Sequence, residues 1–581
     1  MNEDVPGADP LQIADYVVFA LMLLVSTGIS LYCARIGRSQ SNSRDFLTGG
    51  RKLTALPVSL SLTAGILSSV ILLSLPVEVY CYGAIIGYTC IAYFLAQVCT
   101  SEIFLPIFYR LAITSTFQYL ELRFNRATRL LATFVMVLIT GLVIYAPALA
   151  LNQVTGWNLW LLIFVTGTVC TICCTLGGMK AVVWINVFQI GIMFAGLMSV
   201  ICKCLVLEGG ISVLRHTFWT ILIGGTVGWT MASGTNQGQV QKYNSCKSIT
   251  HARIAVFLNL LSFWLFLASA VFSGLCLYSF YKNCDPWTAG QISSPDQLMP
   301  YLVMDILKGH PGLPGLFLAA VYSGTLSTVS STLNAIVAVT LEDLIKPYIR
   351  LTDSQFLYVS RGLSICFGVV CITMAGLASL MGLLVQARAV IGGVTGGPMF
   401  GLFVLGILCP FANSKGGLFG LAFGSAATLS VTLGHMLSYS DPEMTRPLSL
   451  NTEGCNITTA GSVNWTTAFP PQLNLSTMSL VHRTSNWHSP SYLYFSLIGF
   501  LTTVIVGMII SIYTGGLNQR VEPRLMLMKE DTISYHLFEL IKYKASPVVW
   551  KQVSSTRGEI NFISPFRSRK DQAGLNRMRW R

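Results

Sequence analysis

Charged side chains are scarce in this sequence. Only 10% of its 581 residues are Asp, Glu, Lys or Arg, and 53% are hydrophobic, whereas an average soluble domain has about 25% charged residues. This composition excludes a soluble globular protein and predicts a polytopic membrane protein. The net charge of +13 does not indicate nucleic acid, because the Lys and Arg lie in loops between apolar runs and in the tail, where anionic lipid attracts them.

Signatures of enzymes and resident cofactors are also missing. The chain has no Gly-Lys-Ser/Thr phosphate loop, no His pair at metal-ligand spacing and no Ser-His-Asp set outside the membrane. We therefore expect neither catalysis nor a cofactor. Most of the sixteen Cys lie inside apolar runs, where a thiol is a small hydrophobic group. Cys284 and Cys455 differ, because both fall in segments expected outside the cell, where oxidation allows a disulfide between them.

About thirteen apolar runs are long enough to cross a bilayer. The first is preceded by acidic residues and followed by five basic ones between Arg35 and Lys52. This order is the reverse of a cleaved signal peptide, and it places the N-terminus outside because Lys and Arg favour the inner side. The expected spans begin near residues 14, 55, 84, 128, 158, 183, 218, 252, 312, 356, 384, 417 and 490.

Three N-glycosylation acceptor motifs support the same orientation. Asn456, Asn464 and Asn474 each begin an Asn-x-Ser/Thr motif inside loop 439–489, and such motifs accept glycans on the outer side. Thirteen crossings from an outside start also put this loop outside. We therefore expect a multi-pass plasma-membrane protein with its N-terminus outside and its C-terminus in the cytoplasm.

Two spans carry polar and glycine-rich interruptions. The second contains Ser-Leu-Ser-Leu-Thr-Ala-Gly-Ile-Leu-Ser-Ser at 59–69, and the seventh contains Gly-Gly-Thr-Val-Gly-Trp at 224–229 and a polar run at 233–237. Irregular backbone survives in hydrocarbon only where it lines a cavity. Interruptions at corresponding places in two halves predict an inverted-repeat transporter with its site at the midplane. For either span alone, small residues that serve helix packing are an equal explanation.

The ninth span has the densest run of hydroxyl groups, from Ser323 to Thr332. Hard cations prefer several oxygen ligands, and hydroxyls supply them without burying a fixed charge. A sodium site is therefore one interpretation, with Ser327 and Thr328 as its hydroxyl ligands. The alternative is that the hydroxyls bond back to their own helix or join neighbouring helices, and it suits most of these positions.

The chain resembles the sodium/solute symporter family, and in it the subgroup of sodium-coupled monocarboxylate, iodide and multivitamin transporters. The resemblance covers about residues 14–515 and is closest to the monocarboxylate branch. The stretches that carry it are YAPALALNQVTG at 145–156, HTFWT at 216–220, CDPWT at 284–288, PDQLMP at 295–300, SGTLST at 323–328 and EDLIKP at 342–347.

The resemblance implies an all-α, LeuT-type inverted-repeat fold with ten core spans, from the second to the eleventh. It implies sodium-coupled symport of a small organic anion such as lactate, pyruvate, nicotinate or a short-chain fatty acid. It also implies a sodium site between the second and ninth spans. The ligands would be the carbonyl oxygens of Ala64, Leu67 and Gly324 and the hydroxyls of Ser327 and Thr328.

Several positions depart from the family pattern. Relatives have a polar residue where this chain has Ile71, and an aromatic residue or Met where it has Gly392. Trp229 is kept, but the Tyr four residues later is Ser233. Relatives have a carboxylate that the resemblance implicates in sodium handling, and this chain has Asn186 at that position. The outer segment 208–215 is shorter than in relatives. These changes favour an alternative, a weakly coupled sodium channel or solute sensor, and leave iodide and vitamin carboxylates open as substrates.

Arg388 is an ionised residue in the apolar run 383–408, where relatives have a small side chain. It precedes Gly392 by four residues, so both share one helix face. One interpretation is that Arg388 reaches water or lipid phosphate at the outer end of the span. The other is that its guanidinium attracts the substrate carboxylate.

The chain thus divides into six segments. The expected partners are sodium, a small anionic solute and the lipid bilayer; nucleic acid is excluded and the oligomeric state stays open. The segments are an extracellular N-terminus (1–13), the first span with a basic internal loop (14–54), two inverted repeats (55–204 and 205–408), two last spans with the glycosylated loop (409–514), and a basic cytoplasmic tail (515–581).

Overall fold

The computed structural model is helical throughout the part of the chain that it describes. The only β-type pairing in that part is one bridge between Leu53 and Cys246, which confirms the all-α class. The chain divides into two units, Met1–Met528 and Lys529–Arg581. The described residues are 12–37, 49–67, 69–140, 159–204, 219–287, 289, 291–292, 297–307, 309–349, 352–379, 392–437, 494–519 and 521–536.

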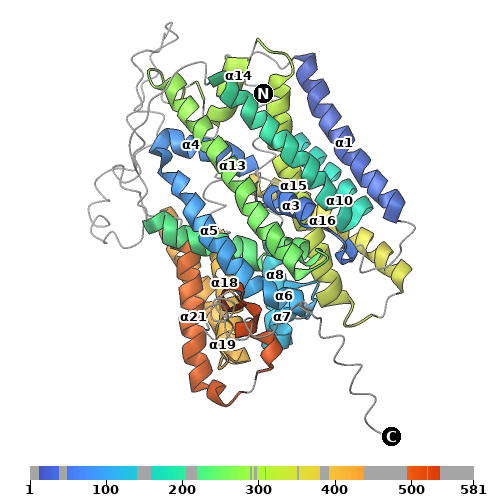
Figure 1. The fold of residues 1–581 in the computed structure, drawn as a ribbon, viewed down its shortest axis with the longest axis vertical. Coiled ribbons are helices and arrows are strands. Elements are labelled where there is room, and N and C mark those ends of the chain that lie inside the picture. The colour runs from blue at the N-terminus through green and yellow to red at the C-terminus, as the bar shows by residue number, and fades with distance from the viewer. Residues whose placement is uncertain are drawn as a thin grey trace, which may run out of the picture. The chain divides into compact units, whose positions relative to one another are not determined.

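Figure 1 shows how the helices are arranged. The second unit contributes one short 3-10 helix, Lys529–Asp531. The helices of the first unit are α1 (Ile13–Gly37), η1 (Gly49–Arg51), α3 (Ala55–Ile66), α4 (Ser69–Tyr82), η2 (Ala84–Tyr88), α5 (Thr89–Cys99), η3 (Thr100–Phe104), α6 (Leu105–Leu111), α7 (Thr116–Arg123), α8 (Arg126–Thr140), α10 (Leu159–Cys204), η6 (Thr220–Gly224), α11 (Gly225–Thr230), η7 (Met231–Thr235), α12 (Gln237–Asn244), α13 (Ile249–Tyr281), α14 (Leu298–Leu307), α15 (Leu313–Thr340), η9 (Leu341–Ile345), α16 (Asp353–Ser379), η10 (Gly392–Gly396), α18 (Gly397–Leu408), α19 (Ser414–Leu437), α21 (Phe495–Tyr513), η14 (Gly516–Asn518) and η15 (Pro523–Leu525).

Seven helices in the described ranges are long and apolar enough to span a membrane, or eight if the bent pair α3 and α4 counts as one span. The multi-pass prediction is therefore confirmed. The count of thirteen is not confirmed, because several expected spans are shorter apolar helices here, among them Trp160–Val169 and Gly397–Leu408. That count and the boundaries of the two repeats stay predictions.

The spans expected near residues 158 and 183 are joined in the single helix α10. The backbone changes direction at Gly178, which has φ 59° and ψ −162°. A residue with a Cβ is strained at this positive φ, so glycine permits the change without a loop. Lys180 follows two residues later. The internal loop expected here is therefore a kink, and the second half, Gly178–Lys203, is long enough to span.

The interrupted second span lies at the centre of the helix arrangement. Its first half, α3, contacts α10, α13 and α15 (Figure 1). The chain bends by 59° between α3 and α4. The interrupted seventh span is likewise built from short pieces, with two π-helical turns, η6 and η7, flanking α11. Both predicted interruptions are thus present, and such turns recur at functional sites.

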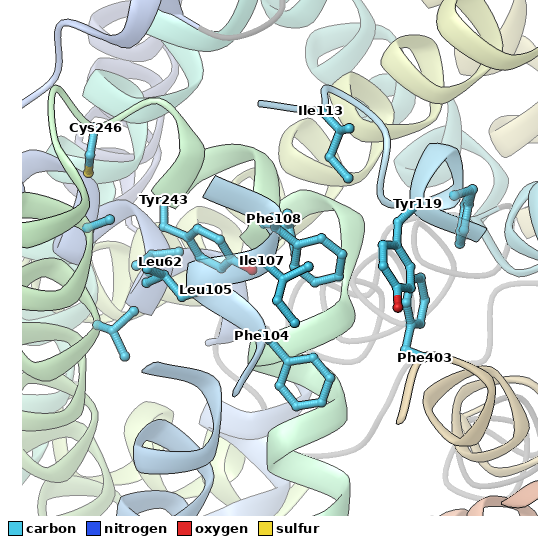
Figure 2. Close-up of a cluster of buried hydrophobic side chains, with 14 of the residues drawn as sticks. Leu62, Phe104, Leu105, Ile107, Phe108, Ile113, Tyr119, Tyr243, Cys246 and Phe403 are labelled. Carbon is cyan, nitrogen blue, oxygen red and sulfur yellow. The ribbon is translucent and has the colours of Figure 1, made fainter. Parts of the chain in front are cut away.

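Aromatic side chains join several helices in one buried cluster (Figure 2). Tyr119 of α7 stacks on Phe403 of α18, with ring centroids 6.1 Å apart, and Phe108 of α6 meets both rings edge-on. Such contacts contribute about 0.5–1.5 kcal/mol each beyond their buried area. They hold α6 and α7 against α18 and so position the short helices that lead to the broken spans.

Helix α14 was not expected from the sequence. It buries Leu298, Met299 and Leu302 against α4 and α15. Its ten residues are too few to cross a bilayer. A sequence search for apolar runs long enough to span a bilayer therefore does not find α14, although its apolar residues form a continuous helix face.

Candidate functional site

The break between α3 and α4 exposes backbone oxygen atoms. Helix α3 ends at Ile66, and Leu67 is extended with φ −73° and ψ 95°. The amide of Leu67 donates to the carbonyl of Thr63 at 2.9 Å. A helix that ends at Ile66 leaves its last carbonyls, including that of Ala64, without helical partners. Ala64 and Leu67 are both buried, so the break provides the kind of oxygen that the predicted site requires.

Helix α15 presents the predicted hydroxyl ligands, and the two differ in bonding. Thr328 Oγ1 donates to the carbonyl of Gly324 at 3.0 Å, so this hydroxyl bonds back to its own helix. Ser327 is 0% exposed, and its Oγ has no hydrogen-bond partner among the described residues. A buried hydroxyl without a partner needs an explanation, and a cation ligand is one. Most hydroxyls nearby follow the back-bonding alternative, including Thr325, Ser330, Ser331 and Thr332.

Asn186 connects three helices beside these residues. Its Nδ2 donates to the Oγ of Ser61 on α3 at 2.9 Å and to the Oγ of Ser331 on α15 at 3.4 Å. Asn186 is fully buried on α10, and its Oδ1 has no partner in the described part of the chain. The bridge holds α3 and α15 together one helical turn from Ala64 and Ser327. The coupling role of Asn186 stays a prediction.

A lysine contacts the same bridge. Lys242 of α12 is 1% exposed, and its Nζ donates to the carbonyl of Ser61 at 2.8 Å. Gly65 leaves the room that this ammonium occupies, since a Cβ there would lie 2.3 Å from Nζ. No amino acid pattern had marked Lys242, which looked like an ordinary basic residue of an internal loop.

Three aromatic rings form a box on the other side of α3. Tyr93 of α5 stacks on Phe263 of α13 with ring centroids 4.0 Å apart. Trp229 of α11 meets both rings edge-on, at 5.3 Å from Tyr93 and 5.0 Å from Phe263. The expected pocket residue Trp229 thus joins two rings that the sequence reasoning had not included.

Polar side chains line this aromatic box. Thr63 Oγ1 donates to Asn259 Oδ1 at 2.7 Å, and Asn259 Nδ2 donates to the Tyr93 hydroxyl at 2.8 Å. Gln97 Nε2 donates to the Oγ of Ser233 at 3.0 Å. All five side chains are buried. Such groups are costly inside a membrane and mark functional positions, and each presents donors or acceptors that suit a small polar solute.

The remaining predicted pocket residues are placed less directly. Ile71 is partly buried in the apolar cluster that contains Ala64, Leu67 and Phe263. Gly392 begins η10, and four residues later a Cβ at Gly396 would lie 2.4 Å from Met231 Sδ of η7. The turn that carries Gly392 therefore contacts the interrupted seventh span. Arg388 lies outside the described residues.

Tyr93, Gln97 and Asn259 are the functional candidates that the sequence analysis missed. A polar residue inside an apolar run was the available signal, because Gln97 and Asn259 each have apolar neighbours on both sides. Tyr93 gave no such signal, since aromatic residues are common in spans.

Charged and polar contacts join several of the shorter helices. Arg129 of α8 forms ion pairs with Glu121 of α7 and with Asp343 of η9. Ser115 Oγ also donates to Asp343 at 3.0 Å. The Gln237 side chain accepts from the amide of Thr116 and donates to the carbonyl of Thr114, both at 2.7 Å. These contacts hold α7, α8, η9 and α12 together.

The predicted outer features lie mostly beyond the described residues. Cys284 is disulfide-bonded, but Cys455 and the three acceptor residues Asn456, Asn464 and Asn474 are outside the described ranges. The Cys284–Cys455 pairing and the glycosylation therefore stay predictions. Next to Cys284, Asp285 accepts a hydrogen bond from the Tyr80 hydroxyl at 2.7 Å.

A model of the Sodium:solute symporter family matches residues 46–221 and 212–424. The chain belongs to this family. Membership makes it a membrane transporter and not an enzyme, as the missing catalytic signatures predicted. The resemblance noted from short motifs is therefore confirmed.

Individual relatives are similar along most of their length. Sodium-coupled monocarboxylate transporter 1 of Homo sapiens is 50% identical, covering 93% of this chain and 95% of its own length. Sodium-coupled monocarboxylate transporter 2 of Mus musculus is 46% identical, over 86% and 84%. The Homo sapiens sodium/iodide cotransporter is 43% identical, over 86% and 83%.

The fold also matches a solved structure. A Na+-coupled sialic acid symporter in a substrate-bound outward-open state aligns with a TM-score of 0.67 and 22% identity, covering 86% of this chain and 98% of that chain. Identity this low shows the fold alone, and it confirms the LeuT-type helix arrangement.

Proposed function

We propose that this protein is a plasma-membrane symporter that carries a small monocarboxylate into the cell together with sodium. Lactate, pyruvate, nicotinate and short-chain fatty acids are the candidate substrates. The proposal includes an outside N-terminus and a cytoplasmic C-terminus.

The single observation that carries the proposal is the 50% identity to sodium-coupled monocarboxylate transporter 1, which extends over nearly the full length of both chains. The sodium/iodide cotransporter covers less of this chain at lower identity. We therefore favour a carboxylate over iodide. Competition between the two anions in one uptake assay tests this preference.

The chemistry of the aromatic box suits a small organic anion. Trp229, Phe263 and Tyr93 offer apolar surface for a short carbon skeleton. Gln97, Ser233 and Asn259 offer neutral hydrogen-bonding groups for oxygen atoms. Because these six side chains carry no charge, we infer that sodium at α3 and α15 supplies the positive charge that the carboxylate needs.

Sodium would bind at the break of α3. Its ligands are the carbonyls of Ala64, Leu67 and Gly324 and the hydroxyls of Ser327 and Thr328. Ser327 is the strongest of these assignments, because its buried Oγ has no hydrogen-bond partner among the described residues. Cation and anion thereby occupy opposite sides of one helix, so that each stabilises the conformation which binds the other.

The number of sodium ions sets the driving force. A tenfold gradient supplies about 1.4 kcal/mol per ion, so one sodium with one monoanion is electroneutral and supports about tenfold accumulation. Two sodium ions would add one net charge, about 2.3 kcal/mol per 100 mV, and support accumulation of a few thousandfold. Asn186 in place of a carboxylate favours the one-ion case.

Uptake of labelled lactate, pyruvate, nicotinate and butyrate into proteoliposomes that contain the purified full chain tests the proposal. We expect uptake of at least one of them with an inward sodium gradient and none when choline replaces sodium. Equal uptake in choline would contradict sodium coupling. Sodium current without any uptake would support the second candidate, a sodium channel or solute sensor, which Asn186 and the altered pocket positions favour.

A further inference from the structure

We propose that the ammonium group of Lys242 is a tethered cation at the inner end of the sodium region, which weakens sodium binding and limits coupling to one sodium ion. The inference rests on the proposed sodium coupling. It assigns to a side chain of an internal helix the control of how many ions are transported.

The position of Lys242 relative to the predicted ligands carries the argument. Its Nζ bonds the carbonyl of Ser61, three residues before Ala64 on α3. The Cβ position of Gly65 lies 2.3 Å from this Nζ and 3.6 Å from the Oγ of Ser331. Ser331 in turn follows the predicted ligand Ser327 by four residues on α15. The ammonium therefore lies one helical turn inward of the sodium ligands on both helices.

The charge of Lys242 is not neutralised by a carboxylate in the described part of the chain. Its one hydrogen bond is to a backbone carbonyl, and burial, which no neighbouring charge offsets, lowers the pKa of Lys242 to about 7. The side chain is therefore mostly charged below pH 7 and mostly neutral above it. Two cations at short range repel strongly where water is excluded. Sodium at the break of α3 is therefore bound against this repulsion.

Asn186 completes the arrangement. Its carboxamide donates to Ser61 Oγ, while Lys242 donates to the carbonyl of the same residue. A carboxylate at position 186 would therefore lie next to the ammonium and pair with it. Changing Asn186 alone to Asp should thus create a neutral ion pair and not a second sodium site. Both positions must change before a second sodium ion can bind.

Sodium binding to the purified full chain tests the first part, with tryptophan fluorescence as readout and choline as the control cation. At pH 6, where Lys242 is mostly protonated, we expect Lys242→Met to lower the sodium Kd about tenfold, whereas Lys242→Arg, which keeps the charge, should stay close to the unaltered chain. An unchanged Kd in Lys242→Met would overturn the proposal. A higher sodium Kd in Lys242→Arg, with no change in Lys242→Met, would also overturn it, because it would mean that the lysine is uncharged.

Substrate-evoked current and the Hill coefficient for sodium test the second part. A purely structural role of Lys242 would change neither quantity. We expect Asn186→Asp alone to keep a Hill coefficient of about one and little current. Asn186→Asp combined with Lys242→Met should raise the coefficient toward two and produce inward current. A large current in Asn186→Asp alone would contradict the proposal. This single variant tests the proposal even if Lys242→Met fails to fold.

Failure of this inference is distinguishable from failure of the proposed function. If the unaltered chain binds no sodium and shows no sodium-dependent uptake, both are wrong. If the unaltered chain binds sodium and takes up a monocarboxylate, while Lys242→Met changes neither Kd nor Hill coefficient, only the role of Lys242 is wrong.

Discussion

The two faces of α3 present different chemical groups. On the side of α15 the proposed ligands are mainly backbone carbonyls and short hydroxyls, whose availability depends on where a helix breaks. On the side of α5 and α13 the aromatic box consists of large side chains joined by hydrogen bonds, such as Tyr93 and Asn259. Substitution of side chains near the first face leaves its backbone ligands in place, whereas each substitution in the second face alters the chemistry of the aromatic box. We infer that this family can keep one cation while its members differ in the anion.

The largest expected effect belongs to the sodium face. Ser327→Ala removes a buried hydroxyl that no other group replaces, and the apparent sodium affinity should fall about 10- to 100-fold. Uptake at low sodium should fail and recover partly at high sodium. Ser323→Ala is the matched control, because Ser323 has the same buried, unpartnered hydroxyl one turn earlier on α15. Equal losses in both variants would argue against a ligand role specific to Ser327.

Thr328→Ala should have a smaller effect than Ser327→Ala. The Thr328 hydroxyl donates to Gly324, so its loss also frees that carbonyl for the cation and offsets part of the lost ligand. We expect the sodium affinity to fall about fivefold. Sodium titration of uptake in the two variants, side by side, measures the difference, and an unchanged affinity in both would place the site elsewhere.

On the anion face, Tyr93→Phe removes a hydroxyl and leaves Asn259 Nδ2 without its acceptor. The KM for the anion should rise about fivefold, with sodium affinity almost unchanged. Tyr301→Phe is the matched control, since the Tyr301 hydroxyl bonds Gln291 at an exposed position. A shift of sodium affinity as large as that of KM would show that the two faces are not separable.

Gln97 and Ser233 should act as one unit on the anion face, because Gln97 donates to Ser233. In a double-mutant cycle, Gln97→Ala and Ser233→Ala should each raise KM about threefold, and the double variant should lose little more than either alone. Strict additivity of the two effects would mean that the residues contact the anion independently.

The smallest expected effect belongs to Arg388, which lies outside the described residues. If its guanidinium attracts the anion, Arg388→Ala should raise KM about threefold and Arg388→Lys somewhat less, with sodium affinity unchanged. A normal KM in Arg388→Ala would leave only the alternative, contact with water or lipid phosphate at the outer end of the span.

Much of the helix geometry around the proposed sodium site could be predicted from the sequence, because its signals are local. The run from Ser59 to Ser69 and the hydroxyl run of α15 mark a broken helix and its oxygen-rich neighbour without knowledge of tertiary structure. The choice between ligand and back-bonding hydroxyl could not be predicted. Neighbours in sequence such as Ser327 and Thr328 look alike until the hydrogen bonds are known.

The anion face could be predicted only in part. Trp229 and Ser233 were expected, but Tyr93 and Phe263 come from helices that are far apart in sequence, and aromatic residues also fill ordinary membrane cores. The box exists only because α5 meets both α11 and α13, next to the contact of α13 with α3. The kink at Gly178 was not predicted, for a different reason. One glycine with a positive φ replaces a loop that hydropathy predicts.

Coupling between the two faces is the central claim, and reciprocal binding tests it most directly. The Kd of the identified monocarboxylate is measured with sodium and with choline, and the Kd of sodium is measured with and without the anion. We expect each ligand to tighten the other by the same factor, about 5- to 150-fold for typical coupling. Anion binding that is equally tight in sodium and in choline would contradict the account.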